Sequence, residues 1–220
     1  MKKIISGKKS ISKKIQVMVC VLLVSITLTG FFNLSFSSEK VDIDETAKET
    51  LRKELENMPS FKARFFQDNN HRNGGQSAGV FFFSKNHKFK MIYKTGDTPY
   101  EFTFDGYWLA QDDTELKQIS YIHKEDFPLA YLFDDPEAFI SLVTYLKARE
   151  DQSGHRVYDI KAKDLQGAVS IFFNRKTGQL SGWQLKNEDN STTYLVFKDY
   201  EKNPTVSDDF FALPNASKYH

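Results

Sequence analysis

The chain has 220 residues, of which 30 are basic and 29 are acidic, and a formal net charge of +1. This balance argues against a nucleic-acid-binding protein held mainly by counterion release. The single cysteine excludes a disulfide framework within the chain. A content of 40% hydrophobic and 27% charged residues indicates a globular protein, and 20 Phe with 10 Tyr give it an unusually large aromatic load.

The first 37 residues have the pattern of a signal peptide. Residues 1–14 contain six lysines and no acid, an apolar run follows over 15–36, and Ser35 and Ser37 are small residues at the −3 and −1 positions of a cleavage site. We therefore predict a signal peptide over residues 1–37. The alternative is an uncleaved anchor, because an apolar run of this length could span a bilayer. Both predictions place the rest of the chain outside the cytoplasmic membrane.

Removal of the signal peptide would change the composition. It would leave 183 residues with a net charge of −5, because six basic and no acidic residues would leave with it. Cys20 would leave as well. Cys20 does not fit a lipoprotein acylation site, since Val-Met-Val precedes it and apolar sequence continues past it.

The first element expected in the mature chain is a helix over 46–58, after a polar stretch. Leu51, Leu55 and Met58 fall on one stripe at positions i, i+4 and i+7, with charged residues elsewhere. A Pro-Ser pair directly after Met58 ends the helix.

Strands with a period of two are expected next. In most of them aromatic or aliphatic side chains alternate with charged ones, so that one face is apolar. The predicted strands lie at 61–65, 80–83, 88–93, 100–105, 107–111 and 118–124. The strand at 80–83 is apolar on both faces, so its orientation stays open.

The middle of the chain changes to a helical period. A short apolar helix is predicted over 127–133, and an Asp-Pro pair at 135–136 starts a second helix with a cap and a proline at its first position. The apolar stripe of the second helix consists of Phe139, Leu142, Val143 and Leu146. This pattern predicts a helical insert over about 127–148. Four more strands are then expected at 156–163, 169–175, 180–187 and 192–200, within a single domain over 38–220.

About ten antiparallel strands with one apolar face suit one curved sheet with an apolar concave side. They could also supply the two facing sheets of a sandwich. The helices favour the curved sheet, because their short apolar stripes cannot fill its concave side. The remaining aromatic side chains would then line a cavity for a long apolar ligand. On the pattern alone, an ordinary sandwich core stays open as the alternative.

The sequence lacks patterns of catalysis and metal binding. The five histidines are scattered, and no HExxH, GxSxG, P-loop or GxGxxG motif occurs. The acidic pairs at 112–113 and 134–135 are typical of solvated turns and helix caps. We therefore expect no enzyme activity, no cofactor and no metal site.

Several short motifs, in a fixed order, resemble one known family. Ser60-Phe61-Lys62-Ala63-Arg64-Phe65-Phe66-Gln67 resembles the first strand of the LolA family, which has the form S-F-x-A-x-F-x-Q. The similarity continues through Gly79, Phe89, Asp105-Gly106, Gln118 and Pro128, and ends in Phe210–Pro214, which resembles the closing F-x-x-x-P of the family. The resemblance covers about residues 45–216, which is nearly the whole mature chain.

The resemblance to the LolA family implies an incomplete antiparallel β-barrel, closed by a lid of short α-helices over a hydrophobic cavity. It implies a periplasmic carrier in a Gram-negative bacterium, with acylated lipoproteins as cargo and no cofactor. The implied partners are an inner-membrane lipoprotein-releasing ABC transporter and an outer-membrane receptor of LolB type. The carrier is expected to be a monomer that does not bind nucleic acid.

The same resemblance implies which residues line the cavity. Those from the first helix and the concave strands are Leu51, Leu55, Met58, Phe61, Phe65, Phe81, Phe83, Phe89, Met91, Tyr93, Phe102 and Phe104, and those from the lid are Leu129, Leu132 and Phe133. Strand parity could instead turn Val80 and Phe82 inward. Where the family usually has Arg-Pro, with the Arg bonding the lid closed, this chain has Lys85-Asn86. Lys85 is thus the candidate latch, although lysine lacks the planar donor fork of arginine.

Two other functions stay open beside the lipoprotein carrier. One is a LolA-fold protein that binds a different lipid or senses envelope stress, and that would be membrane-anchored if the signal peptide is not cleaved. The other is a lipid-modifying enzyme, which the missing nucleophile and base motifs disfavour.

Overall fold

The computed structural model of the chain describes residues 42–70, 75–95, 98–163, 165 and 167–219. The predicted signal peptide and Cys20 lie outside the described residues. Within the described ranges, no helix is long and apolar enough to cross a membrane.

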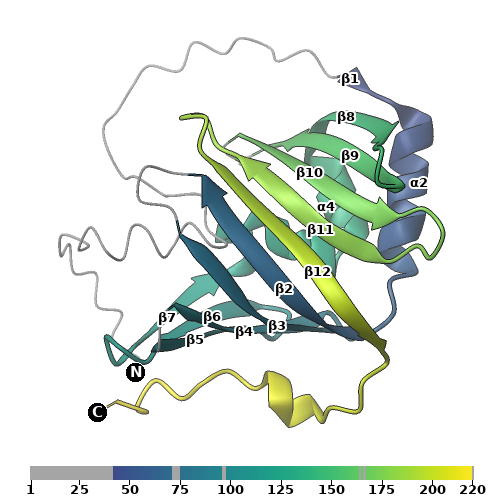
Figure 1. Cartoon of the computed structure of the whole chain (residues 1–220). Helices are drawn as coiled ribbons and strands as arrows, with labels where there is room; N and C mark the ends of the chain where they lie inside the picture. The colour runs from purple at the N-terminus through teal and green to yellow at the C-terminus, as the bar shows by residue number, and fades with distance from the viewer. Residues whose placement is uncertain (1–41, 71–74, 96–97, 164, 166, 220) are drawn as a thin grey trace.

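Twelve strands of the described chain form one sheet in the order β1-β8-β9-β10-β11-β12-β2-β3-β4-β5-β6-β7 (Figure 1). The strands are β1 Asp42–Ile43, β2 Phe61–Asn70, β3 Gln76–Ser84, β4 Lys88–Thr95, β5 Thr98–Phe104, β6 Trp108–Asp113, β7 Gln118–His123, β8 Val143–Glu150, β9 His155–Ala162, β10 Ala168–Asn174, β11 Leu180–Lys186 and β12 Thr192–Lys202. All neighbours are antiparallel except β1 and β8. Because the edge strands β1 and β7 do not pair with each other, the curved sheet does not close into a barrel.

The alternation of the strands places their aromatic side chains on the concave face. Phe81 and Phe83 are buried there, whereas Val80 and Phe82 point outward and are partly exposed. Of the two orientations left open by the sequence, the structure has the one in which Phe81 and Phe83 face inward. The predicted incomplete barrel with a helical lid is confirmed, and the sandwich alternative is wrong.

The first helix, α2, spans Glu45–Glu56 and begins one residue before the predicted start. Asp44 caps it, because its carboxylate accepts hydrogen bonds from the backbone N–H groups of Thr46 and Ala47, both at 3.0 Å. The apolar side of α2 packs against α4 and β8. Part of the expected polar lead-in is instead the short strand β1, which pairs in parallel with β8.

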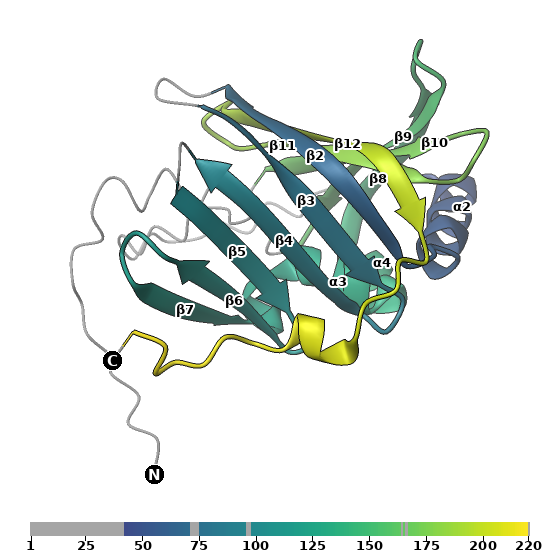
Figure 2. The same cartoon turned by 60° about the horizontal axis from the view of Figure 1, so that its bottom comes forward.

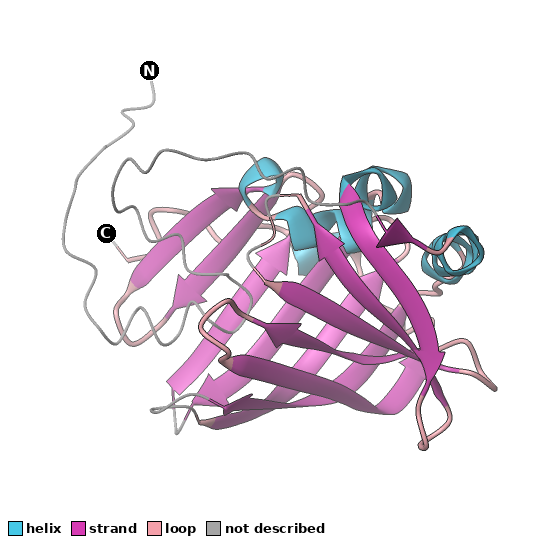
Figure 3. Ribbon diagram, turned by 90° about the horizontal axis from the view of Figure 1, so that it is seen from above, coloured by secondary structure: helices cyan, strands magenta, loops and turns pink. Residues whose placement is uncertain are grey.

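The helical insert consists of the 3-10 helices η1 Lys124–Asp126 and η2 Pro128–Ala130 and the helices α3 Tyr131–Asp134 and α4 Pro136–Leu142. The helices lie against the concave side of the sheet (Figure 3).

The prediction that the helical insert reaches about residue 148 is wrong, because β8 begins at Val143. A bulge explains the error. Val143 pairs with Ala162 and Tyr145 with Lys161, so Thr144 is an extra residue in β8. The bulge turns Val143 and Leu146 to the same buried face at a spacing of three, which imitates a helical stripe.

The chain after β12 runs along the outer side of the sheet towards β7 (Figure 2). It includes the 3-10 helix η3 Asp208–Phe211. The ring of Phe210 lies 4.7 Å from that of Phe82 on β3, and the Tyr121 hydroxyl on β7 donates to the Pro214 carbonyl at 2.6 Å. This segment therefore covers outward-facing aromatic residues that the sequence pattern left exposed.

Candidate lipid-binding site

The interior of the curved sheet is one cluster of buried apolar side chains. All fifteen residues predicted to line a cavity belong to it, from Leu51 on α2 to Phe133 on α3. The structure therefore brings all of them together, on the same side of the sheet. It shows their burial, and their role in ligand binding stays a prediction.

The other half of this interior was missed by sequence reasoning. It comes from β8–β12, and its members include Leu146, Tyr158, Ile160, Val169, Ile171, Phe173, Leu180, Trp183, Leu185, Leu195 and Phe197. Part of the signal was present in the sequence, because Trp183 and Leu185 on β11 alternate with Gln184 and Lys186. On β12 the alternation is less clear, since the apolar Val196 separates Leu195 from Phe197.

Neighbouring strands stack their rings along the concave face. The ring centroid of Phe89 on β4 lies 5.7 Å from Phe81 on β3 and 5.2 Å from Phe104 on β5. Phe81 in turn lies 5.1 Å from Phe197 on β12. Such ring pairs add attraction beyond the area that they bury, yet none of them involves a directional polar bond. A surface of this kind can contact a hydrocarbon chain in many arrangements.

Phe133 on α3 occupies the centre of the interior. Its ring centroid lies 5.2 Å from Phe89, 5.7 Å from Phe81 and 6.0 Å from Trp183. It thus contacts β4 and β3 in one arm of the curved sheet and β11 in the other. Phe133 both fills the concave side and holds the short helices against it.

The polar ties of the lid involve residues that the sequence analysis did not select. The Lys124 ammonium lies 2.7 Å from the Asp134 carboxylate, and it also lies over the rings of Tyr107 and Tyr131. The hydrogen bond to Asp134 raises the pKa of Lys124, so the ammonium stays charged at neutral pH. A sequence signal existed, because these opposite charges flank the apolar insert directly. A second tie joins α2 to α4, where Arg52 Nε lies 2.7 Å from Glu137.

The predicted latch, Lys85, has no contact with the lid in the described residues. Its side chain is exposed in the turn between β3 and β4 and has no hydrogen bond or ion pair there. Only its backbone N–H is engaged, and it donates to the Ser60 hydroxyl at 2.9 Å. The structure therefore gives no support to a latch at Lys85.

The acidic pair at 112–113 is not in a solvated turn as predicted. Both carboxylates are buried at the end of β6. Asp112 accepts hydrogen bonds from Lys218 and Tyr219, and Asp113 accepts one from the Leu116 backbone N–H. These bonds anchor the C-terminal segment and a turn. In the described part of the chain, no three His, Cys, Asp or Glu residues are grouped so as to hold a metal ion.

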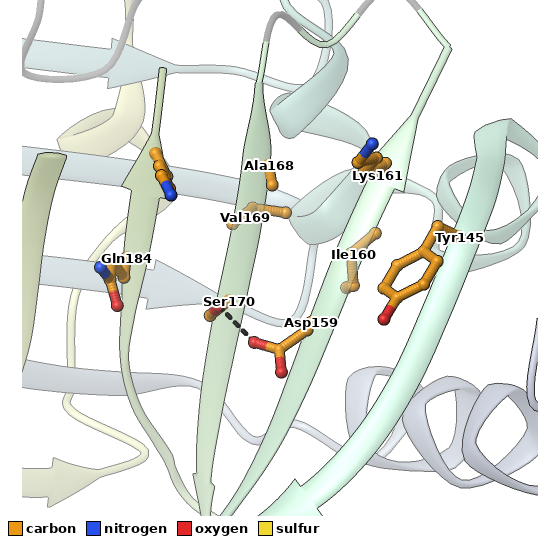
Figure 4. Close-up of a pocket in the computed structure, with 9 residues that line it drawn as sticks. Tyr145, Asp159, Ile160, Lys161, Ala168, Val169, Ser170 and Gln184 are labelled. Atoms are coloured by element: carbon orange, nitrogen blue, oxygen red, sulfur yellow. Dashed lines mark hydrogen bonds between the residues drawn. The ribbon is translucent and has the colours of Figure 1, made fainter. Parts of the chain in front are cut away.

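A separate hollow of about 220 Å³ lies between β8 and β11, away from the aromatic interior (Figure 4). Polar side chains line much of it, and the Ser170 hydroxyl donates to Asp159 at 2.6 Å. Its volume is below that of typical small-molecule sites, and none of the fifteen predicted residues lines it. We assign the candidate site to the concave interior, because it contains all fifteen residues that the family resemblance implies.

A family model described as "Outer membrane lipoprotein carrier protein LolA" matches residues 56–214. A protein of Cupriavidus taiwanensis named "Outer-membrane lipoprotein carrier protein" is 31% identical over 144 residues. The match spans 62% of this chain and 66% of that relative, which is just under two thirds of its length.

Two solved structures share the fold at low sequence identity. An uncharacterized conserved protein from Thermus thermophilus matches with a TM-score of 0.51 at 7% identity, over 76% of this chain and 93% of that one. The crystal structure of MucB matches with a TM-score of 0.50 at 14% identity, over 79% and 64%. At these identities the likeness concerns the fold alone.

Proposed function

The chain belongs to the LolA family, and from this premise we propose that it binds the acyl chains of lipoproteins and carries them between membranes. The observation that carries the proposal is the interior itself. A continuous layer of stacked aromatic rings lies on the concave face, and short helices cover it through Phe133. Displacement of the short helices with their buried side chains would give hydrocarbon chains access to the layer.

The energetics fit such a carrier. Each methylene group left in water costs about 0.8 kcal/mol, so a lipoprotein with several acyl chains cannot cross an aqueous compartment unprotected. A carrier must also release its cargo, and dispersion contacts with aromatic rings have no fixed geometry to break. The ring layer therefore suits a ligand that is shielded during transport and later handed on.

The proposal extends to location and partners. The predicted signal peptide and the family assignment support the periplasm of a Gram-negative bacterium. An inner-membrane ABC transporter would load the cargo, and an outer-membrane receptor of LolB type would accept it. The sequence has no P-loop, so the direction of transfer would come from the energy of the transporter and from differences in affinity. We propose no enzymatic reaction for this chain.

Mass spectrometry of the ligand extracted with the native protein tests the proposal. We expect lipoproteins whose N-terminal cysteine carries acyl chains. Recovery of free phospholipid or glycolipid, with no lipoprotein even when the transporter is overproduced, would contradict it. That outcome would instead favour the second candidate, a LolA-fold protein with a different lipid ligand, which the shared fold of MucB keeps open.

A further inference from the structure

Among the residues that the structure describes, three polar atoms at one end of the apolar interior are buried and have no hydrogen-bond partner. They are Gln67 Oε1 on β2, Ser77 Oγ on β3 and the Tyr93 hydroxyl on β4. Gln67 lies opposite Ser77 in the pairing of β2 with β3, and Tyr93 lies opposite Gly79, the next inward position on β3. The three residues are therefore neighbours on adjacent strands.

Strand parity turns all three side chains to the concave face. Gln67 follows Phe65 by two residues, Tyr93 follows Met91 by two, and Ser77 precedes the inward-facing Phe81 by four. The ring of Tyr93 lies 6.1 Å from that of Phe65. The polar atoms thus face the same interior as the aromatic layer.

Burial makes these unpaired atoms costly. The side chains of Gln67 and Tyr93 are both only 2% exposed. The Gln67 amide nitrogen already donates to Asn69 at 3.1 Å, which leaves its oxygen as the free atom. The neighbouring Tyr100 shows the usual arrangement, because its hydroxyl donates to Glu115 at 3.1 Å. Buried polar groups normally have partners, so an unpaired group that persists calls for a ligand or a functional reason.

The two ends of the interior differ in polarity. Phe133 on α3 contacts Phe83 and Phe89, which flank the turn between β3 and β4. Gln67, Ser77 and Tyr93 lie at the opposite ends of their strands, and α3 and α4 lie near the end where β2 begins (Figure 2). The interior is therefore apolar under the lid and becomes polar at the other rim.

We infer that this polar rim, formed by Gln67, Ser77 and Tyr93, binds the ester and amide groups that join acyl chains to an N-acylated, S-diacylglyceryl cysteine. The Tyr93 and Ser77 hydroxyls donate to ester carbonyls, and Gln67 Oε1 accepts from the amide N–H. The acyl chains point towards Phe133, and the polypeptide leaves on the side of the polar rim. This inference rests on the proposed function and names the part of the cargo that is recognised.

The rim should favour ligands that supply a hydrogen-bond donor, because Gln67 Oε1 can only accept. The ester groups of a diacylglycerol offer only acceptors, whereas an N-acylated cysteine offers acceptors and an amide N–H. Gln67 Oε1 therefore finds a donor in the amide N–H of the second ligand and none in the ester groups of the first. Burial raises the pKa of Tyr93, so its hydroxyl stays protonated and remains a donor.

Tyr93→Phe is the first test, with Tyr100→Phe as the matched control on a stacked neighbouring ring. Binding is measured for a synthetic tripalmitoyl-cysteinyl peptide and for its analogue with ether links in place of the esters. We expect Tyr93→Phe to weaken binding of the ester peptide about three- to tenfold and to leave binding of the ether analogue unchanged. Tyr100→Phe should change neither affinity. The thermal midpoint of ligand-free Tyr93→Phe should equal or exceed that of the wild type, because an unpaired buried hydroxyl has been removed.

Gln67→Leu tests the amide contact. We expect it to weaken binding of the tripalmitoyl peptide by a similar factor and to leave binding of an analogue with an N-methylated amide unchanged.

Three results would overturn the inference. The first is an equal loss of affinity for the ester and the ether peptide. The second is an unchanged affinity of both variants for every peptide, which is expected if only water satisfies these atoms. The third is a lower thermal midpoint for Tyr93→Phe than for the wild type. In each case, binding of the peptides by the wild type would leave the proposed function standing. A wild type that binds none of these peptides would instead contradict the proposed function itself.

Discussion

The helix α2 and the helices of the lid cover the same interior but are held in different ways. α2 has 12 residues, a side-chain cap at Asp44 and a flanking strand, β1, that pairs with the sheet. The lid helices α3 and α4 have four and seven residues, and α3 has no side-chain cap. Helices this short are not stable alone in water, so the lid depends on its contacts with the sheet.

The lid is therefore the part of this cover that we expect to move. The lid contacts consist of buried side chains, which include Leu129, Leu132 and Phe133, and of two ion pairs, Lys124–Asp134 and Arg52–Glu137. Loss of these contacts would open the interior and leave the pairing of the sheet intact. We therefore expect local opening of residues 127–142 at a lower free energy than global unfolding.

The largest effect is expected for Phe133→Ala. Removal of a buried phenylalanine ring typically costs about 3 kcal/mol or more. We expect the loss to appear mainly as opening of the lid, with faster hydrogen exchange at 127–142, unchanged exchange in α2 and brighter fluorescence of an apolar dye added to the protein.

Phe172→Ala is the matched control for Phe133→Ala. Phe172 is 8% exposed against 6% for Phe133, but it packs on Tyr194 at the outer face of the sheet. Phe172→Ala should lower stability without increasing dye binding. Equal dye binding by the two variants would show that the lid has no special role in closing the interior.

The two helix caps provide a comparison of intermediate size. Asp44 caps α2 and Asp135 caps α4, where its carboxylate accepts from the Ala138 N–H at 2.9 Å. Either change to alanine should cost about 1 kcal/mol. Asp135→Ala should speed hydrogen exchange only in the lid, whereas Asp44→Ala should lower the free energy of unfolding measured in urea. Identical exchange patterns would mean that α2 and the lid open as one unit.

The smallest effect is expected from the lysines. Lys124→Met removes the partly buried ion pair with Asp134 and should ease lid opening by about 1 kcal/mol or less. Lys85→Met should change nothing measurable, because the exposed ammonium has no partner within the described residues. Hydrogen exchange at 127–142 compares the two variants. A larger effect at Lys85 would restore it as the latch.

The strands around Phe61, Phe89 and Phe102 were predictable because each has one buried and one solvated face, which fixes a period of two. The same reasoning placed these aromatic residues on one face of the sheet, but it left the orientation of 80–83 open, and the set of fifteen cavity residues came from the family resemblance. It failed at β8, where the bulge at Thr144 put Val143 and Leu146 on one face. A bulge is set by pairing with β9, which a local pattern does not contain.

The lid contacts and the polar rim were not predictable for a related reason. Lys124 meets Asp134 because the chain folds back between them, and Gln67 meets Ser77 because β2 pairs with β3 in one register. Gln67 belongs to the motif that resembles the first strand of the LolA family, yet no sequence feature indicates that its side-chain oxygen lacks a hydrogen-bond partner. Whether a buried polar atom has a hydrogen-bond partner depends on the strands that lie beside it, and a local sequence pattern does not contain that information.

Site-specific photo-crosslinking tests most directly whether the aromatic interior is the cargo site. The photoreactive residue p-benzoylphenylalanine would replace Phe133 in the lid, and in a second variant Tyr194 on the outer face, during active lipoprotein transport in the native host. We expect acylated lipoproteins to be captured from position 133 and not from position 194. Capture from position 194 alone, or capture of lipoproteins without their acyl chains, would contradict the claim that the aromatic interior is the cargo site.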